Sequence, residues 1–143
     1  MEKRTFAMIK PDAVACHYTG QIITLIEKAG FRIIAQKMLR LTTSDTNKFY
    51  AVHSQRPFFR NLSLFMTSGP VVVMVLEKEN AIAEFRTLIG NTDPQTAPIG
   101  SIRKTFGQSK TRNAIHGSDS DENALKEIHF FFLSIYMKDK LFF

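Results

Sequence analysis

Short apolar runs alternate with helical patterns along the first part of this 143-residue chain. Arg4 to Ile9 is a mostly apolar run that stops at Lys10-Pro11-Asp12. Because proline has no amide donor for a sheet, this pattern predicts a strand that ends there. From Gly20 to Gly30 the apolar positions follow the period of a helix, and Gly30 is the expected C-cap.

The next segments predict a strand followed by a helix. Apolar and other residues alternate over residues 31–41, and this period of two is typical of a strand. One side of that strand is expected to carry Phe31, Ile33, Ala35, Lys37, Leu39 and Leu41. Ser44 or Asp45 is then expected to cap a helix that runs to about Ser54.

The middle of the chain predicts a helix, a turn and a buried strand. Pro57 suits the first position of a helix over residues 58–66. Ser68-Gly69-Pro70 is expected to form a turn. Residues 71–76 are an unbroken run of β-branched and other apolar side chains, which is typical of a strand buried on both faces.

Two more helices are predicted in the second half. Asn80 is expected to cap a helix over residues 81–89. Ser120 or Asp121 is expected to cap a last helix that runs to roughly Ser134.

This order of elements indicates an α+β fold. A short strand near Ala114 and Ile115 would complete a ferredoxin-like β-α-β-β-α-β pattern, with an antiparallel sheet covered by helices. The sequence shows no internal repeat, linker or low-complexity tract, so residues 1–143 are expected to form a single domain. The fold hosts many unrelated activities, and function therefore has to be argued from individual residues.

Composition narrows the class of protein. The chain has a net charge of +6, but its Lys and Arg residues are scattered, which suits either a phosphate pocket or a solubilising surface. Its one cysteine, Cys16, excludes an internal disulfide, and no apolar run is long enough for a membrane helix. No signal peptide is visible, so the expected location is cytoplasmic.

The segment 91–112 has no convincing period and is unusually long for a loop in a compact domain. Such loops are either functional or disordered. This one and the helix before it carry several cations that would suit a polyphosphate: Arg86, Arg103, Lys104, Lys110 and Arg112.

His116 is the most informative single residue. It is followed by Gly117 and three small polar residues before the last predicted helix. Gly117 is expected to let the backbone turn, so that the imidazole stands clear of its neighbours. A histidine is mostly neutral at pH 7 and can act as a nucleophile. A His-Gly pair in a loop also occurs without catalysis, so local chemistry alone leaves a structural role open.

The segment around His116 resembles the active-site signature of the nucleoside diphosphate kinase family. The matching residues are Asn113 and then His116-Gly117-Ser118-Asp119-Ser120. Other matches follow in the family's order and spacing and cover about residues 4 to 133. They are Phe6 to Ala13, Phe49-Tyr50, Arg56-Pro57-Phe58-Phe59, Ser68 to Val72 and Gly100-Ser101-Ile102-Arg103.

The resemblance implies a ping-pong reaction. His116 would take the γ-phosphate of a nucleoside triphosphate and pass it to a nucleoside diphosphate, with broad tolerance for the base. The family carries the phosphate on Nδ1, which the sequence does not specify. Glu127 corresponds to the carboxylate that orients the imidazole, assisted by Ser118. Lys10 and Tyr50 are also expected at the catalytic centre.

The resemblance further implies a set of nucleotide-binding residues. Arg86, Thr92 and Arg103 correspond to the phosphate ligands, and guanidinium groups suit phosphates because their donors are forked. Lys10 and Asn113 correspond to the ligands of the sugar hydroxyls.

Phe58 and Leu62 lie four positions apart and share one face of their predicted helix. In the family such a pair borders the base, and apolar contact without hydrogen bonds would accept any base. On spacing alone, core packing is the alternative. Mg²⁺ is expected to bridge the phosphates, with no direct protein ligand.

The expected partners are nucleoside di- and triphosphates and further copies of this chain, in a hexamer rather than a tetramer. A membrane is not expected as a partner, nor nucleic acid as a primary one. Two alternatives would share the fold. One is a non-catalytic relative that binds nucleotides or nucleic acid. The other is a relay protein that passes phosphate from His116 to other proteins.

Overall fold

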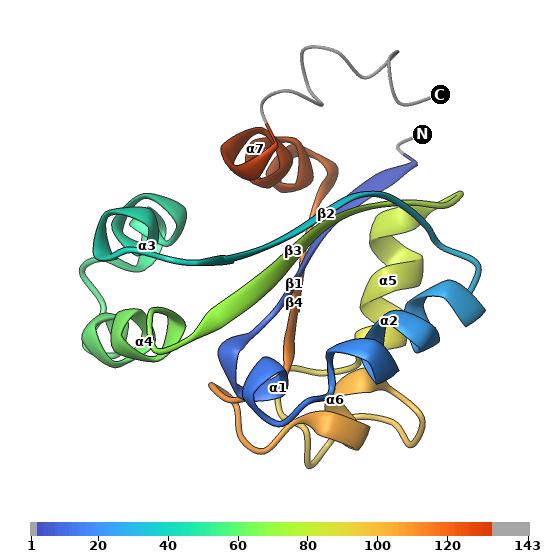
Figure 1. The fold of residues 1–143 in the computed structure, drawn as a ribbon, viewed down its shortest axis with the longest axis horizontal. Coiled ribbons are helices and arrows are strands. Elements are labelled where there is room, and N and C mark those ends of the chain that lie inside the picture. The colour runs from blue at the N-terminus through green and yellow to red at the C-terminus, as the bar shows by residue number, and fades with distance from the viewer. Residues whose placement is uncertain (1–2, 133–143) are drawn as a thin grey trace.

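The computed structural model describes residues 3–132, which form a four-stranded antiparallel sheet with helices on both faces (Figure 1). The strand order is β2-β3-β1-β4. The strands are β1 (Arg4–Ile9), β2 (Arg32–Arg40), β3 (Pro70–Glu77) and β4 (Ile115–Gly117). The predicted α+β, ferredoxin-like antiparallel sheet is confirmed. The strand expected near residues 114 and 115 begins one residue later.

Two groups of helices cover the two faces of the sheet (Figure 1). The α2 side of the sheet is covered by α1 (Pro11–Ala15), α2 (Thr19–Lys28), α5 (Ala81–Ile89) and α6 (Ile102–Phe106). The α7 side is covered by α3 (Thr43–Phe49), α4 (Phe59–Met66) and α7 (Asp121–Phe131). A short 3₁₀ helix, η1 (Ala51–His53), connects α3 to the segment before α4.

β3 supplies side chains to both cores, as its unbroken apolar run predicts. Val71, Val73 and Val75 pack on the α7 side. Met74 and Leu76 pack on the α2 side, against helix residues that are fully buried. Successive strand side chains point to opposite faces, so a strand with no polar position is stable only where both faces are covered.

The alternation predicted for residues 31–41 is wrong for the strand as a whole. A β-bulge between Ile33 and Ala35 shifts the register of β2 against β3. An extra residue on one strand reverses the face to which later side chains point. Phe31 and Ile33 consequently pack on the α2 side, whereas Ala35 and Leu39 pack on the α7 side.

The ends of α2 and α3 follow ordinary capping rules. Gly30 follows α2 with φ +93°, and its N–H donates to the carbonyl of Glu27 at 3.0 Å. This left-handed conformation ends the helix where the sequence predicts. α3 begins earlier than predicted because its cap is Thr42, not Ser44 or Asp45. The Thr42 hydroxyl accepts from the Asp45 N–H at 3.1 Å, and the Asp45 carboxylate accepts from the Thr42 N–H at 2.8 Å.

Two other predicted starts differ from the structure. α4 has Phe58 as its N-cap, so Pro57 precedes the helix and is not its first residue. Asn80 does precede α5, but its φ is +55° and its side chain makes no capping hydrogen bond. Asparagine tolerates this left-handed conformation better than most residues, which accounts for its place there. Ser134, the predicted end of the last helix, lies outside the described residues.

The sequence pattern predicts neither α1 nor α6, because five residues are too few to establish a helical period. α6 lies inside the segment 91–112, which is an ordered loop around a helix. Ser101 caps α6 by accepting from the Lys104 N–H at 3.2 Å. Within residues 3–132, no helix has both the length and the apolar character needed to cross a membrane.

Candidate active site

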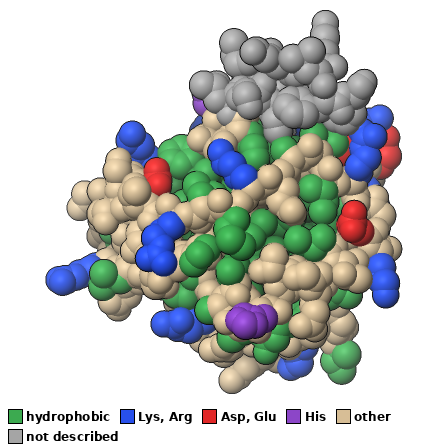
Figure 2. Space-filling view, viewed as in Figure 1, with side chains coloured by type: hydrophobic (Ala, Val, Ile, Leu, Met, Phe, Trp, Pro, Cys, Tyr) green, Lys and Arg blue, Asp and Glu red, His purple; other side chains and the backbone are tan. Residues whose placement is uncertain are grey.

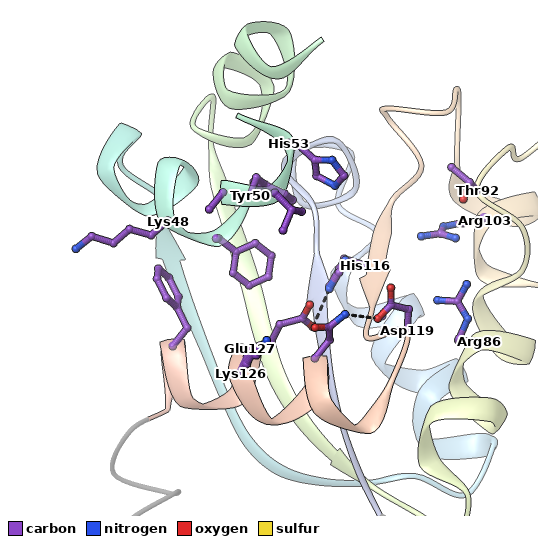
Figure 3. A pocket seen from close by; sticks show the side chains of 16 residues that line it. Lys48, Tyr50, His53, Arg86, Thr92, Arg103, His116, Asp119, Lys126 and Glu127 are labelled. Atoms are coloured by element: carbon purple, nitrogen blue, oxygen red, sulfur yellow. Dashed lines mark hydrogen bonds and ion pairs between the residues drawn. The ribbon is translucent and has the colours of Figure 1, made fainter. Parts of the chain in front are cut away.

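A pocket of about 610 Å³ lies between the α3–η1 segment, α7 and the ordered loop, at β4 (Figure 3). Several residues singled out in the sequence line it together. They are Tyr50, Arg86, Thr92, Arg103, His116 and Glu127. The segments that carry them are far apart in the chain, and the sheet brings them into one place.

His116 lies in β4, opposite Met8 of the central strand β1. Its ring is flanked by Phe6, with centroids 6.0 Å apart, and by Phe49, at 5.7 Å in an edge contact. Its Nε2 atom lies 3.0 Å from a carboxylate oxygen of Glu127 (Figure 3). A carboxylate accepts the proton of the nitrogen it faces, which leaves Nδ1 with its lone pair free to attack an electrophile.

Glu127 reaches His116 because α7 starts close to the end of β4. The hydroxyl of Ser120 caps α7 by accepting from the Asn123 N–H at 3.1 Å. The Glu127 carboxylate then lies two turns into the helix, beneath the imidazole. Ser118 donates its hydroxyl to the same carboxylate oxygen at 2.6 Å. One oxygen of the carboxylate thus contacts both His116 and Ser118, which fixes it in place and gives the imidazole ring a preferred orientation.

Gly117 has a different role from the predicted one. It lies in β4, and its backbone does not adopt the left-handed conformation. A Cβ at this position would be 2.7 Å from the ring of Phe85 in α5. Glycine is needed because β4 lies directly against α5, and this close packing sets the depth of the neighbouring His116.

Two arginines line the side of the pocket opposite Glu127 (Figure 3). Arg103, on α6, donates from Nη1 to the carbonyl of Gly90 at 3.0 Å and from Nη2 to that of Ile115 at 2.9 Å. Burial, and then the charge of Arg86, lower the pKa of Arg103 to about 10. The Arg103 guanidinium is therefore still charged at neutral pH. This side of the pocket therefore favours an anion.

Lys10 and Asn113 bind each other outside the pocket lining. The Lys10 ammonium donates to the Asn113 side-chain oxygen at 2.8 Å, and both residues are buried. The Asn113 amide donates to the carbonyls of Thr92 and Lys110, each at 3.0 Å. Neither residue is part of the pocket lining, but Asn113 bonds directly to Thr92, which does line the pocket, and Lys10 is connected to Thr92 through Asn113.

Phe58 and Leu62 are also outside the pocket lining. Phe58 is 48% exposed, and its ring lies 5.6 Å from that of His53. Leu62 is half-buried and packs against the core on the α7 side. The structure thus does not place the two side chains together in the pocket, and their contact with a base stays a prediction.

The pocket is also lined by residues that the sequence analysis did not select for the site, among them His53, Asp119 and Lys48. His53, in η1, faces it from above in Figure 3, and its buried Nδ1 has no hydrogen-bond partner among residues 3–132. Asp119 accepts from the Asn123 amide at 2.6 Å, and this bond lowers the pKa of Asp119. Lys48 belongs to α3. The pattern gives no signal for His53 because a histidine in a helical segment is usually a packing or surface residue.

Tyr50 closes the pocket above Glu127. Burial, and then the nearby charge of Glu127, raise the pKa of Tyr50, so its hydroxyl is protonated at neutral pH. The pocket thus holds a nucleophilic imidazole nitrogen, a carboxylate that fixes the imidazole, a neutral hydroxyl and two arginines. This arrangement suits transfer of an anionic group through a covalent intermediate.

Comparison with known proteins agrees with this geometry. The family model for nucleoside diphosphate kinase matches residues 3–135. A nucleoside diphosphate kinase of Prosthecochloris aestuarii is 56% identical over 130 residues, which cover 91% of this chain and 92% of that protein.

Two solved structures are similar throughout. The Aquifex aeolicus nucleoside diphosphate kinase has a TM-score of 0.87 at 48% identity, covering 91% of this chain and 94% of that one. A halophilic nucleoside diphosphate kinase from Halobacterium salinarum, solved in complex with CDP, has a TM-score of 0.88 at 40% identity, covering 92% and 88%. This chain belongs to the nucleoside diphosphate kinase family.

Proposed function

We propose that this enzyme moves the γ-phosphate of a nucleoside triphosphate to a nucleoside diphosphate through a phosphohistidine on His116. The observation that carries the proposal is the 3.0 Å contact between His116 Nε2 and Glu127, which leaves Nδ1 free in a pocket that Arg86 and Arg103 also line. Nδ1 forms a bond to the γ-phosphorus while the bond from phosphorus to the bridging oxygen of the leaving diphosphate breaks. In the second half-reaction a new diphosphate reverses these steps.

The other site residues stabilise the charge that moves. Arg86, Thr92 and Arg103 would hold the phosphates, and the arginines would spread the charge of the transferring group. Lys10 and Asn113 would hold the sugar hydroxyls, with Lys10 also near the moving phosphate.

Two hydroxyl groups complete the proposed site. Tyr50 would donate its protonated hydroxyl near the γ-phosphate. Ser118 would hold Glu127 in place, as its 2.6 Å hydrogen bond to that carboxylate suggests.

We propose that the base makes few specific contacts. Phe58 and Leu62 offer apolar surface and no hydrogen-bond donors, and every base has a face that can stack. The values of kcat/KM for ADP, GDP, CDP and UDP are therefore expected to agree within about tenfold. A preference of about a thousandfold for one base would contradict this and would require a hydrogen-bonding contact to the base.

We propose that Mg²⁺ arrives with the nucleotide as part of the substrate. Among residues 3–132 no group of three or more His, Cys, Asp and Glu is placed to hold a metal ion. Arg86 and Arg103 also make the phosphate side of the pocket unfavourable for a bare cation. The nucleotide phosphates would hold the ion, which would neutralise part of their charge during transfer.

One experiment tests the proposed function. The protein is incubated with Mg²⁺ and γ-labelled ATP, separated from nucleotide, and examined for a phosphate that is labile in acid and stable in base. GDP or UDP is then added. We expect the label to appear on the protein first and in GTP or UTP afterwards.

The outcomes of this experiment also separate the alternatives. Label that stays on His116 with every diphosphate tried would contradict the kinase proposal and favour a relay protein. A protein that takes up no label, but binds duplex nucleic acid with a steep salt dependence, would indicate the non-catalytic relative.

The charge of Lys10 predicts a pH dependence. Burial, and then the charge of Arg103, lower the pKa of Lys10 to about 8. Its ammonium form, which attracts phosphate, is present below this pH and is lost as the pH rises through it. The Kd for ADP is expected to stay nearly constant up to about pH 7 and to rise about tenfold by about pH 9, which is a loss of affinity. Isothermal calorimetry across this range measures it.

Lys10→Arg is the control for this pH dependence. A guanidinium stays charged throughout the range, so the alkaline loss of affinity should disappear even if the affinity itself is lower. An alkaline loss that persists unchanged in Lys10→Arg would assign the titration to another group.

Glu127→Gln tests the role of the carboxylate. The variant keeps an acceptor oxygen but loses the charge that favours the proton on Nε2. We expect single-turnover phosphorylation of His116 by MgATP to slow about 10- to 100-fold, with the Kd for ADP little changed. Rapid-quench measurement gives the rate. Glu122→Gln, on the exposed side of the same helix, should react at the wild-type rate, and equal slowing in both variants would contradict the role.

We also propose a homo-oligomer, and favour a hexamer over a tetramer. β2 lies at an edge of the sheet, and its Met38 side chain is 58% exposed. Figure 2 shows hydrophobic side chains near the centre of this face, in the region that β2 crosses in Figure 1. Sedimentation equilibrium should give a mass near six times the 16.3 kDa of the chain, and a mass near four times would select the tetramer. The cytoplasmic location stays a prediction.

A further inference from the structure

The residue that leads into β4 has a strained backbone. Ala114 has φ +76°, in the left-handed region, although it is not glycine. A non-glycine residue in this conformation is strained, because its Cβ atom crowds the following carbonyl oxygen. The residue before it is Asn113, which binds Lys10, and two residues after it is His116. The conformation of Ala114 therefore decides how both ends of the site are presented.

Asp12 and Lys10 hold Ala114 from both sides of its backbone. The N–H of Ala114 donates to the Asp12 carboxylate at 3.1 Å, and the carbonyl of Ala114 accepts from the backbone N–H of Lys10 at 2.8 Å. Asp12 is buried, with 6% of its surface exposed, and it belongs to the first turn of α1. A buried carboxylate is a strong acceptor, since charge strengthens the bond and water does not compete.

The charge of Asp12 also acts on the ammonium of Lys10, although Asp12 Oδ1 has no hydrogen-bond partner among residues 3–132. The charged groups that act on Lys10 are Asp12 from α1, which raises its pKa, and Arg103 from α6, which lowers it together with burial. Asn113 is its neutral hydrogen-bond partner. Burial raises the pKa of Asp12 itself, and Lys10 opposes that effect. The Asp12 carboxylate thus affects two parts of the site, the strained backbone at Ala114 and the buried ammonium of Lys10.

We propose that Asp12 is a positioning residue of the active site, whose carboxylate holds Ala114 in its left-handed conformation and, from the same position, stabilises the buried ammonium of Lys10. Asp12 acts through Asn113, Lys10 and the start of β4, and does not touch the reacting atoms. The inference rests on the proposed phosphohistidine function, because it assigns Asp12 to that site.

Substitutions at two positions separate the backbone role from a merely structural one. Asp12→Ala removes the acceptor, and we expect kcat/KM for ADP to fall about tenfold or more. Ala114→Gly takes up the left-handed conformation without strain and should be within about twofold of wild type. Combined with Asp12→Ala, it should restore kcat/KM at least about threefold relative to Asp12→Ala alone. If kcat/KM for ADP falls as much in the double variant as in Asp12→Ala, or further, the backbone role is overturned.

Asp12→Asn tests the charge role with a readout that does not need activity. The amide oxygen still accepts from Ala114, so this variant should fold and melt like the wild type. With lysine labelled at Cε and the signal of Lys10 assigned from Lys10→Arg, NMR titration gives the pKa of Lys10. We expect that pKa to fall by about half a pH unit or more in Asp12→Asn. The alkaline loss of ADP affinity should move to lower pH by the same amount.

Asp45→Asn is the matched control. Asp45 is partly exposed and also accepts a backbone N–H, from Thr42, but it lies in α3 and is not among the groups acting on Lys10. It should leave the pKa of Lys10 and the ADP affinity unchanged. A pKa of Lys10 that is the same in wild type and Asp12→Asn would overturn the charge role.

Failure of the phosphohistidine proposal and failure of the inference about Asp12 would give different experimental results. If His116 takes up no phosphate in the wild type, the phosphohistidine proposal fails, while the pKa of Lys10 in Asp12→Asn still decides the role of Asp12. If His116 is phosphorylated normally but neither the Ala114→Gly rescue nor the shift in the pKa of Lys10 is seen, the inference about Asp12 alone fails.

Discussion

Replacing His116 with alanine is expected to lower kcat/KM for nucleoside diphosphate phosphorylation about 10⁴-fold or more. The imidazole forms the covalent bond in both half-reactions, so its loss removes the pathway and not only a favourable contact. Binding should survive, because Arg103 keeps its bonds to backbone carbonyls and Lys10 keeps its bond to Asn113. A coupled assay gives the turnover, and calorimetry gives the Kd for ADP.

His17→Asn is the control for this substitution. His17 is exposed, lies at the end of α1 away from the pocket lining, and has φ +65°, which asparagine tolerates. It should keep wild-type turnover. Turnover by His116→Ala within about tenfold of wild type would mean that another group carries the phosphate or that transfer is direct.

Arg103→Met is expected to have the second largest effect. The side chain keeps similar length but loses the guanidinium that bonds to the carbonyls of Gly90 and Ile115. Each carbonyl that loses its donor costs about 1–3 kcal/mol, so we expect the free energy of unfolding to fall by about 2–4 kcal/mol. We also expect kcat to fall about 10³-fold, as for other arginines that stabilise a transferring phosphoryl group.

Urea unfolding and steady-state kinetics measure the two effects separately. Arg40→Met, at the exposed end of β2, should change the stability by less than about 0.5 kcal/mol and leave kcat unchanged. A large loss of stability with an unchanged kcat would show that Arg103 only holds the loop together and does not act on the phosphate.

The sheet and most helices follow from local patterns because their signals are long. The buried run of β3 and the helical period of α2 each extend over enough residues to determine the element. The bulge in β2 does not follow, since it depends on pairing with β3 and not on the alternation within β2 itself. α1 and α6 are too short to show a period, although both carry or support site residues.

Candidate site residues could be proposed from the sequence, but their geometry could not. The family resemblance points to His116 and Glu127. Which imidazole nitrogen of His116 is left free depends on where α7 places the Glu127 carboxylate. Gly117 was expected to provide a turn and instead provides space beside Phe85, a contact between distant segments. His53 also lines the pocket. The sequence pattern predicts one helix to about Ser54, whereas α3 ends at Phe49 and His53 belongs to the separate helix η1.

The contact of Asp12 with Ala114 is another feature of the site that the sequence pattern does not predict. The position of Asp12 after Lys10-Pro11 suggests a plain turn residue, and its contact with Ala114 joins segments separated by 102 positions. Tertiary contacts of this kind have no local signal. They decide how precisely the predicted residues are held, and therefore how the chemistry proceeds.

The most direct test of the central claim is the position of phosphate on the imidazole of His116. The enzyme is labelled with ¹⁵N-histidine, phosphorylated with MgATP, freed of nucleotide and examined by ¹H–¹⁵N NMR. Because Glu127 faces Nε2, we predict phosphate on Nδ1, a signal that is lost when GDP is added. Phosphate on Nε2, or no phosphate on His116 while GTP is still formed, would contradict the account.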